Sequence, residues 1–188
     1  MKAVLISIQP KWCKLIASGK KTVEVRKSRP KLETPFKVYI YCTQNTPYSP
    51  VIPMRYEKEG GNIYIGGKRY AEFLTGKVIG EFVCDNIINI VYDVNEYYGV
   101  CQNQTQIPYD ELDKYLNTCM GYGWHISDLV IYDKPKELRE FRRYPRTEHC
   151  GFGECELCRH GDYDQLDDEW FCRNYIARAP QSWCYVED

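Results

Sequence analysis

Three charged side chains within six positions form the most specific pattern in this 188-residue sequence. The stretch from Gly19 to Arg26 reads Gly-Lys-Lys-Thr-Val-Glu-Val-Arg, and its charged trio is Lys21, Glu24 and Arg26. On a strand, Glu24 and Arg26 share one face because successive side chains alternate. Such a pair can read a base edge, since the carboxylate accepts from an exocyclic amine and the cation holds a carbonyl or a phosphate. The alternative is an exposed ladder of ion pairs that contributes little stability.

Four cysteines near the end of the sequence have the spacing of metal ligands. They follow the pattern C-x4-C-x2-C-x13-C at Cys150, Cys155, Cys158 and Cys172. Four thiolates suit a tetrahedral Zn²⁺, and a closed shell of four ligands makes the metal structural rather than catalytic. His149 and His160 are close enough in sequence to replace one sulfur. Disulfides, an iron–sulfur cluster and the absence of a metal are the alternatives.

The residues around these cysteines point to the same interpretation. Residues 148–170 are rich in Gly, Asp and Glu and poor in aliphatic side chains, so they cannot bury enough apolar surface to fold unaided. Structural zinc supplies ~10–16 kcal/mol of folding free energy in small modules. We therefore expect a zinc-binding extension over 142–188 whose tail, with Cys184, packs back on the main domain. The other cysteines are expected to be small core residues, namely Cys13, Cys42, Cys84, Cys101 and Cys119.

A strand, a helix and a second strand must position the charged trio. Val4–Ile8 is predicted to be a buried strand. Pro10 suits the first turn of a helix, and the helix has an apolar stripe at Trp12, Leu15 and Ile16. Gly19 is placed to end the helix in the left-handed conformation. Alternation then predicts a strand over Thr22–Lys27, with Val23 and Val25 in the core and the Glu24 and Arg26 side chains lining a cleft outside it.

Strands outnumber helices in the rest of the sequence and lie too close together for helical crossovers. This favours an α+β fold built on an antiparallel β-barrel with peripheral helices. Residues 44–75 are predicted to be an insertion or arm, in which a turn at 60–62 joins strands at 51–57 and 63–70. A bend is expected near Gly80 and at 84–86 in a long strand over 76–91. The remaining predicted elements are strands at 36–43 and 124–132, a helix at 108–116 and a helical turn at 135–141.

Residues 1–141 resemble the ASCH domain family of the PUA-like superfamily. The motif Gly-x-Lys-x-x-Glu-x-Arg at 19–26 carries the resemblance, together with the strand before it, Gly-Lys-Val-Ile-Gly-Glu at 76–81 and Trp-His-Ile at 124–126. The resemblance implies a small β-barrel with a cleft between barrel and helix that binds RNA or a modified nucleotide. The ligand-binding residues would be Lys21, Glu24, Arg26 and His125, and Trp12 is a candidate for stacking on a base.

One branch of this family resembles an N4-acetylcytidine amidohydrolase, so hydrolysis of an acylated nucleoside is the enzymatic alternative, with Lys21 and Glu24 as the catalytic candidates. In that branch a threonine nucleophile stands two residues before the motif arginine. This chain has Glu24 there, and a carboxylate is a poor substitute for an activated hydroxyl. Thr22 is out of register, and the acid would be Asp110 or Glu111. The sequence therefore favours binding over catalysis.

The charge of the chain is balanced overall and uneven along its length. The formal net charge is −1, whereas residues 11–37 carry +7, residues 134–146 carry +4 and residues 154–169 carry −6. The first segment is predicted to bind phosphates, and the alternative is that its charges only solvate exposed faces. The acidic, cysteine-rich segment suits a protein partner, so a protein-interaction module is the third functional candidate. No apolar run is long enough for a membrane span and no signal peptide is evident, which predicts a cytoplasmic protein with no membrane contact.

Overall fold

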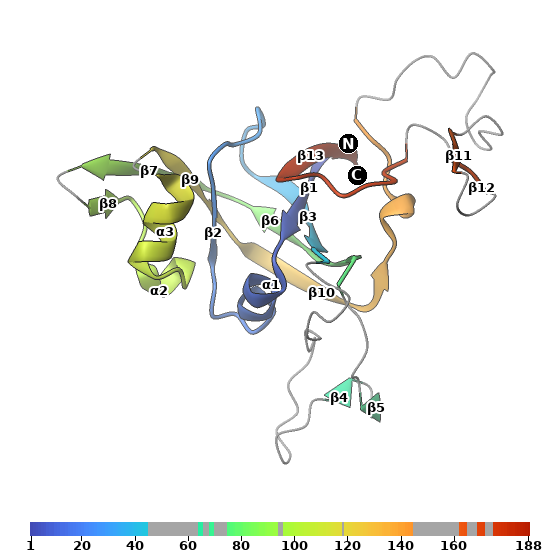
Figure 1. Ribbon diagram of the computed structural model, residues 1–188, viewed down its shortest axis with the longest axis horizontal. Coiled ribbons are helices and arrows are strands. Elements are labelled where there is room, and N and C mark those ends of the chain that lie inside the picture. The colour runs from blue at the N-terminus through green and yellow to red at the C-terminus, as the bar shows by residue number, and fades with distance from the viewer. Residues whose placement is uncertain are drawn as a thin grey trace.

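A five-stranded sheet and a four-stranded sheet, with helices beside them, make up the described part of the chain (Figure 1). The computed structural model describes residues 1–44, 75–93, 96–117, 119–144 and 175–188, together with the backbone of four short strands. Those strands form two separate pairs, β4 (Tyr64–Ile65) with β5 (Lys68–Arg69) and β11 (Asp162–Asp164) with β12 (Glu169–Phe171). The fold belongs to the mixed α+β class, as predicted.

The first three elements match the sequence pattern closely. They are β1 (Lys2–Ile8), α1 (Pro10–Ala17) and β2 (Val23–Arg26). α1 ends at Ala17, and Gly19 after it has a φ of +71°. The Gly19 N–H donates to the Ile16 carbonyl at 2.8 Å and the Lys20 N–H donates to the Leu15 carbonyl at 2.9 Å, which is the Schellman arrangement. This tight end of α1 turns the chain directly into β2 and so positions the motif.

The larger sheet has the strand order β10-β6-β3-β1-β13. Its further strands are β3 (Phe36–Cys42), β6 (Lys77–Cys84), β10 (Ser127–Lys136) and β13 (Trp183–Glu187). β1 and β3 pair in parallel, whereas the other three pairs are antiparallel. The prediction of an antiparallel sheet is therefore wrong for this pair. α1 and β2 together form the crossover that lets β3 run in the same direction as β1.

The smaller sheet has the order β2-β9-β7-β8, with β7 (Ile87–Asp93), β8 (Glu96–Tyr98) and β9 (Gly121–His125). Only residues 85–86 separate β6 from β7, which confirms the predicted bend there. Only Ile126 separates β9 from β10, so the strand predicted over 124–132 is two strands in two sheets. Gly80 is required where β6 meets β10, because a Cβ atom there would lie 2.4 Å from the Val130 carbonyl oxygen.

The predicted closed barrel is not seen among the described strands. They form two sheets joined by the bends of β6–β7 and β9–β10, and β2, β8, β10 and β13 end those sheets without pairing with one another. Because the chain passes from one sheet to the other through these bends, the two sheets pack around a shared core without closing a barrel.

The helices lie beside the smaller sheet and the motif. α2 (Gln102–Thr105) and α3 (Tyr109–Leu116) flank β2 on one side and α1 lies on the other (Figure 1). α3 confirms the predicted helix, and a 3₁₀ turn, η1 (Leu138–Glu140), lies within the predicted 135–141 turn. The predicted hairpin turn at 60–62 is outside the described residues. The β4–β5 pair shows that 63–70 is not one continuous strand.

Three clusters of buried side chains form the core. The largest lies between the two sheets and α1 and includes Ile6, Ile40, Phe82 and Trp124. A second covers the other face of the larger sheet, around Tyr39 and Phe141, and a third joins β2 and β7 to α3. Within the described ranges, no helix has both the length and the apolar character needed to cross a bilayer.

The cysteine predictions hold in part. Cys13, Cys42 and Cys84 are buried, as expected of small core residues. Cys101 and Cys119 are exposed, because Cys101 immediately precedes α2 and Cys119 lies in the connection after α3. Burial raises the pKa of the Cys84 thiol to about 12, so the buried thiol stays protonated and unreactive.

Candidate functional site

Lys21 is the first member of the motif trio, and its side chain is fully buried. The end of α1 holds its backbone, since the Lys21 N–H donates to the Leu15 carbonyl at 3.0 Å. The Lys21 ammonium donates to the Thr105 carbonyl oxygen at 2.6 Å and lies 3.3 Å from Glu24 Oε2. Lys21 therefore ties the turn after α1 to α2 and to β2.

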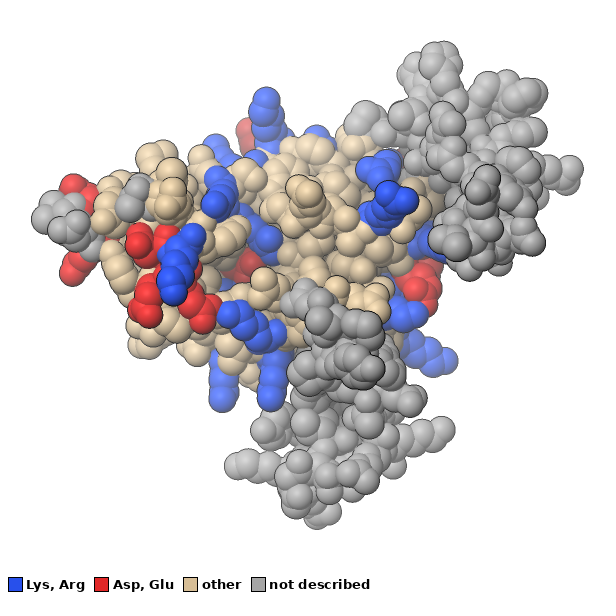
Figure 2. All heavy atoms as spheres, in the orientation of Figure 1, with Lys and Arg blue, Asp and Glu red and all other residues tan. Residues whose placement is uncertain are grey.

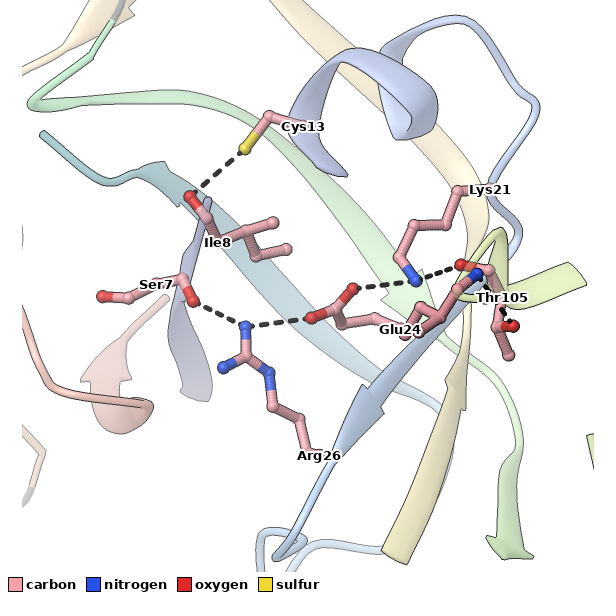
Figure 3. A network of polar contacts seen from close by, with 8 residues as sticks. Ser7, Ile8, Cys13, Lys21, Glu24, Arg26 and Thr105 are labelled. Carbon is pink, nitrogen blue, oxygen red and sulfur yellow. Dashed lines mark hydrogen bonds and ion pairs between the residues drawn. The ribbon is translucent and has the colours of Figure 1, made fainter. Parts of the chain in front are cut away.

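Glu24 links the two cations of the motif. Its Oε1 lies 3.0 Å from Arg26 Nη2, and the same nitrogen donates to the Ser7 carbonyl oxygen at 2.5 Å (Figure 3). The side chains of Glu24 and Arg26 are only 6% and 10% exposed. The pair is therefore buried, and the alternative of an exposed ladder is wrong. The trio is a buried ion network.

The burial of this network sets its electrostatics. Two cations share one carboxylate, so the trio carries a net positive charge in a region of low dielectric. Burial lowers the pKa of Lys21, while the Glu24 carboxylate acts in the opposite direction. The network therefore favours a ligand with oxygen acceptors or negative charge.

A cavity of about 380 Å³ opens over this network between α1, β2 and α3. Its lining includes Glu24, Val25 and Arg26 from β2 and the aromatic residues Trp12 and Tyr115 from the two helices. Figure 3 shows the second terminal nitrogen of Arg26 pointing away from Glu24. A volume of this size, lined by rings and a few fixed polar groups, is typical of a site for a small organic ligand or a nucleobase.

The rim of the cavity is charged and joins two helices. Lys11 on α1 forms an ion pair of 2.6 Å with Glu111 on α3, and both side chains are about half exposed. Lys11 Nζ also lies 4.3 Å from the centre of the Trp12 ring. Lys114 lines the same cavity. Such an exposed pair contributes little stability, so the Lys11 side chain can move when a ligand enters.

The backbone of Val25 adds polar groups on the same side of β2. β2 is an edge strand that pairs only with β9 in its sheet. The Ile126 N–H donates to the Thr22 carbonyl at 2.8 Å, while the Thr22 N–H donates to the Gln104 carbonyl of α2 at 2.9 Å. The Thr22 carbonyl therefore faces β9, and by alternation so do the backbone groups of Glu24 and Arg26, which pair with Trp124 and Tyr122. The N–H and C=O of Val25 therefore face away from β9, and Val25 lines the cavity. A strand edge of this kind offers one donor and one acceptor to a ligand.

The structure does not bring His125 to the cavity. His125 pairs with Val23 across β2 and β9, so it shares the face of Val23 and Val25 and lies on the face opposite to Glu24. Its Nδ1 lies 2.6 Å from Asp85 Oδ1, and this contact holds the pKa of Asp85 below its usual value. His125 and Asp85 thus form a separate, partly exposed pair.

Few hydroxyl groups that could act as nucleophiles line the described part of the cavity. The only hydroxyls among the described cavity-lining residues belong to Ser7 and Tyr115. The Ser7 hydroxyl donates to the Pro180 carbonyl at 2.6 Å, so its proton is directed away from any base. Glu111 does line the cavity, but it is paired with Lys11, and Asp110 is not among the lining residues.

The predicted zinc ligands, Cys150, Cys155, Cys158 and Cys172, lie outside the described residues, as do His149 and His160. Within the described residues, no group of three or more His, Cys, Asp or Glu side chains is placed to hold a metal ion.

Several residues of the site carry no signal in the sequence. Ser7 and Thr105 contribute backbone carbonyls, which any residue type can supply. Lys114 and Tyr115 reach the cavity from α3, nearly ninety positions after the motif, and no local pattern links them to it. An amphipathic pattern over 108–116 predicts the helix, but not which of its polar side chains face β2.

The family comparison agrees with the motif. The family model described as the ASCH domain matches residues 6–182, a range that contains every residue lining the cavity. A crystal structure of an ASCH protein from Zymomonas mobilis is similar with a TM-score of 0.49 and 19% identity over 72% of this chain and 73% of that one. The crystal structure of a mutant of the same protein has a TM-score of 0.49 and 19% identity over 73% of this chain and 77% of that one. No curated protein matches the chain. Because the family model covers nearly the whole chain, the protein belongs to the ASCH domain family.

Proposed function

We propose that the cavity between α1, β2 and α3 binds a base of RNA or a modified nucleotide. The observation that carries the proposal is that one cavity joins the motif residues Glu24 and Arg26 to two aromatic rings, Trp12 and Tyr115. Single-stranded RNA is recognised by stacking of unpaired bases on aromatic side chains, combined with hydrogen bonds to the base edges. The ASCH family is associated with nucleic acids, which supports the same reading.

Each part of the site would contribute one step of recognition. Trp12 and Tyr115 would stack on the base, while Arg26 and the Val25 backbone would bond to its edge. Lys21 and Glu24 would hold Arg26 in place, because the Glu24 carboxylate fixes the guanidinium at 3.0 Å and Lys21 fixes the carboxylate at 3.3 Å. Lys11 and Lys114 would meet phosphate oxygens at the rim.

Binding of single-stranded RNA to variants of Trp12 tests this proposal. Trp12→Leu removes the ring but keeps an apolar side chain against the core, and it is expected to cost about 1–3 kcal/mol of binding free energy, the range for one stacked base. Trp12→Phe keeps a ring and should retain most of the affinity. Fluorescence anisotropy with a labelled oligoribonucleotide measures both.

Tyr98→Leu is the matched control, because Tyr98 is 50% exposed on β8 and does not line the cavity. The proposal is wrong if Trp12→Leu and Tyr98→Leu bind equally well, or if the wild-type protein binds no RNA and no nucleotide.

We also propose a structural zinc ion held by Cys150, Cys155, Cys158 and Cys172. The support is the ligand spacing in the sequence and the poverty of residues 148–170 in apolar side chains. In this proposal the metal stabilises the C-terminal segment and takes no part in the cavity.

A further inference from the structure

Three cations follow the motif at alternate positions in the loop after β2. Lys27, Arg29 and Lys31 are exposed, and we call residues 27–31 the basic loop. Figure 2 shows Lys and Arg side chains over this loop and between α3 and the larger sheet. Among the described residues, none of the three cations belongs to an ion pair. Their charge is therefore available to an anion from outside.

The residues between these cations fix the basic loop to the body of the protein. The Trp183 indole N–H donates to Ser28 Oγ at 3.1 Å, and Pro30 is buried. The Lys31 N–H donates to the Tyr185 hydroxyl at 2.7 Å. β13 therefore anchors the loop at two points, and a fixed backbone carries the three exposed cations. A fixed array loses less conformational entropy on binding than three independent side chains on a mobile segment.

The basic loop begins at the edge of the cavity. Lys27 Nζ lies 5.3 Å from the centre of the Tyr115 ring, which lines the cavity. Arg29 Cζ lies 5.9 Å from the centre of the Tyr122 ring, and Tyr122 pairs with Arg26 across β2 and β9. The row of cations therefore begins beside Tyr115, whose ring would stack on a base, and continues away from the cavity.

We propose that the ligand of the cavity is one nucleotide of a single-stranded polynucleotide whose phosphates continue along the basic loop, rather than a free nucleoside. This rests on the proposed function and narrows it. A free nucleoside carries no phosphate, so it leaves the basic loop unused. A strand places one base in the cavity and its flanking phosphates on Lys27, Arg29 and Lys31, and releases counterions as it does so.

The experiment compares two triple variants of the full chain with the same change in net charge. Lys27→Gln/Arg29→Gln/Lys31→Gln removes the basic loop cations, and Lys20→Gln/Lys134→Gln/Lys136→Gln removes three cations after α1 and on β10. The probes are a labelled oligoribonucleotide of mixed sequence, about ten nucleotides long, the four free nucleosides, and a poly-glutamate peptide. Affinity for the oligoribonucleotide is measured at several salt concentrations.

In the basic loop variant, the slope of log affinity against log salt concentration should be less steep by about 2. Each phosphate contact on a single strand contributes about 0.7 to this slope, and the variant lacks three such contacts. At 0.1 M salt this is about a hundredfold weaker binding. The control variant should change much less. Free nucleosides should bind far more weakly than the oligoribonucleotide, and the basic loop variant should not change their affinity.

The outcomes separate this inference from the function on which it rests. If the oligoribonucleotide binds in a Trp12-dependent way but equally to both triple variants, the basic loop inference is overturned and the cavity function stands. The same holds if free nucleosides bind as tightly as the strand. If the basic loop variant loses as much affinity for poly-glutamate as it loses for the oligoribonucleotide, the loop is a general anion-binding surface. That result also overturns the inference. If the wild-type protein binds neither RNA nor nucleosides, both proposals fall.

Discussion

Glu24 is the residue on which the site depends, because it is the single carboxylate between two buried cations. Removing its charge leaves Lys21 and Arg26 in a region of low dielectric with no counter-charge between them. The spacing in the sequence correctly puts the three side chains together. It cannot show that they are buried, because Thr105, which bonds to Lys21, and the cavity-lining residues of α3 lie far along the chain.

We predict that Glu24→Gln strongly destabilises the protein. Breaking a buried ion pair by removing one partner costs about 3–5 kcal/mol. Urea unfolding followed by circular dichroism measures the change. Glu33→Gln is the matched control, since Glu33 is exposed, and a surface change of this kind should stay within about 0.5 kcal/mol. Equal unfolding midpoints for the two variants would show that the network contributes nothing to stability.

At the scale of elements, β13 joins the far end of the described chain to the first strand. It pairs antiparallel with β1, and Asp188, just after β13, bonds to β3. The Tyr39 hydroxyl donates to Asp188 Oδ1 at 2.7 Å, and Lys37 Nζ lies 2.9 Å from the same oxygen. These two contacts hold the pKa of the Asp188 carboxyl below its usual value, and the contact with Lys37 has the larger effect.

Asp188→Asn should therefore destabilise the protein in a way that depends on pH. A carboxyl with a lowered pKa in the folded state stabilises that state above its unfolded pKa, and this contribution is lost as the pH falls through the folded pKa. We expect the variant to melt a few degrees below the wild type at pH 7, at about 2–4 °C per 1 kcal/mol. The difference should shrink to nothing below the folded pKa. Melting temperatures at a series of pH values test this, and a difference that stays constant down to pH 2 would contradict the assignment.

Local patterns predict the elements near the motif well and the longer strands less well. Pro10 and Gly19 mark the ends of α1, because their backbone preferences act locally. The predicted strand over 124–132 breaks at Ile126 because its two halves pair with different sheets, and an apolar run does not reveal such a change of partner. β8 and α2 are three and four residues long, too short for any periodicity to stand out.

At the scale of the whole molecule, the uneven charge of the sequence maps onto the surface only in part. Lys21 and Arg26 are buried in the network, and Lys37 is paired with Glu81 and Asp188. The other cations of residues 11–37 are exposed: Lys11 at the rim of the cavity, Lys14 and Lys20 on and after α1, and the three cations of the basic loop. The sum of +7 therefore overstates the charge that phosphates can meet. Composition predicts a positive region, but only the fold shows which cations are accessible.

The zinc proposal also concerns the molecule as a whole. Purified protein prepared without a chelator should contain about one zinc per chain by elemental analysis. Cys158→Ser should lose the metal and unfold the cysteine-rich segment of residues 150–172, while the two sheets, β13 included, should survive because they have their own core. Protein without metal, or with disulfides among Cys150, Cys155, Cys158 and Cys172, would contradict the proposal.

The most direct test of the central claim is photocrosslinking of an oligoribonucleotide that contains 4-thiouridine, followed by mass spectrometry of the crosslinked peptides. If a base occupies the cavity, crosslinks should map to peptides containing Trp12 or Tyr115, and unlabelled RNA should compete them away. Crosslinks that map instead to the exposed rings of Tyr98 or Tyr144, with none at Trp12 or Tyr115, would show that RNA binds elsewhere and that the cavity is not its site.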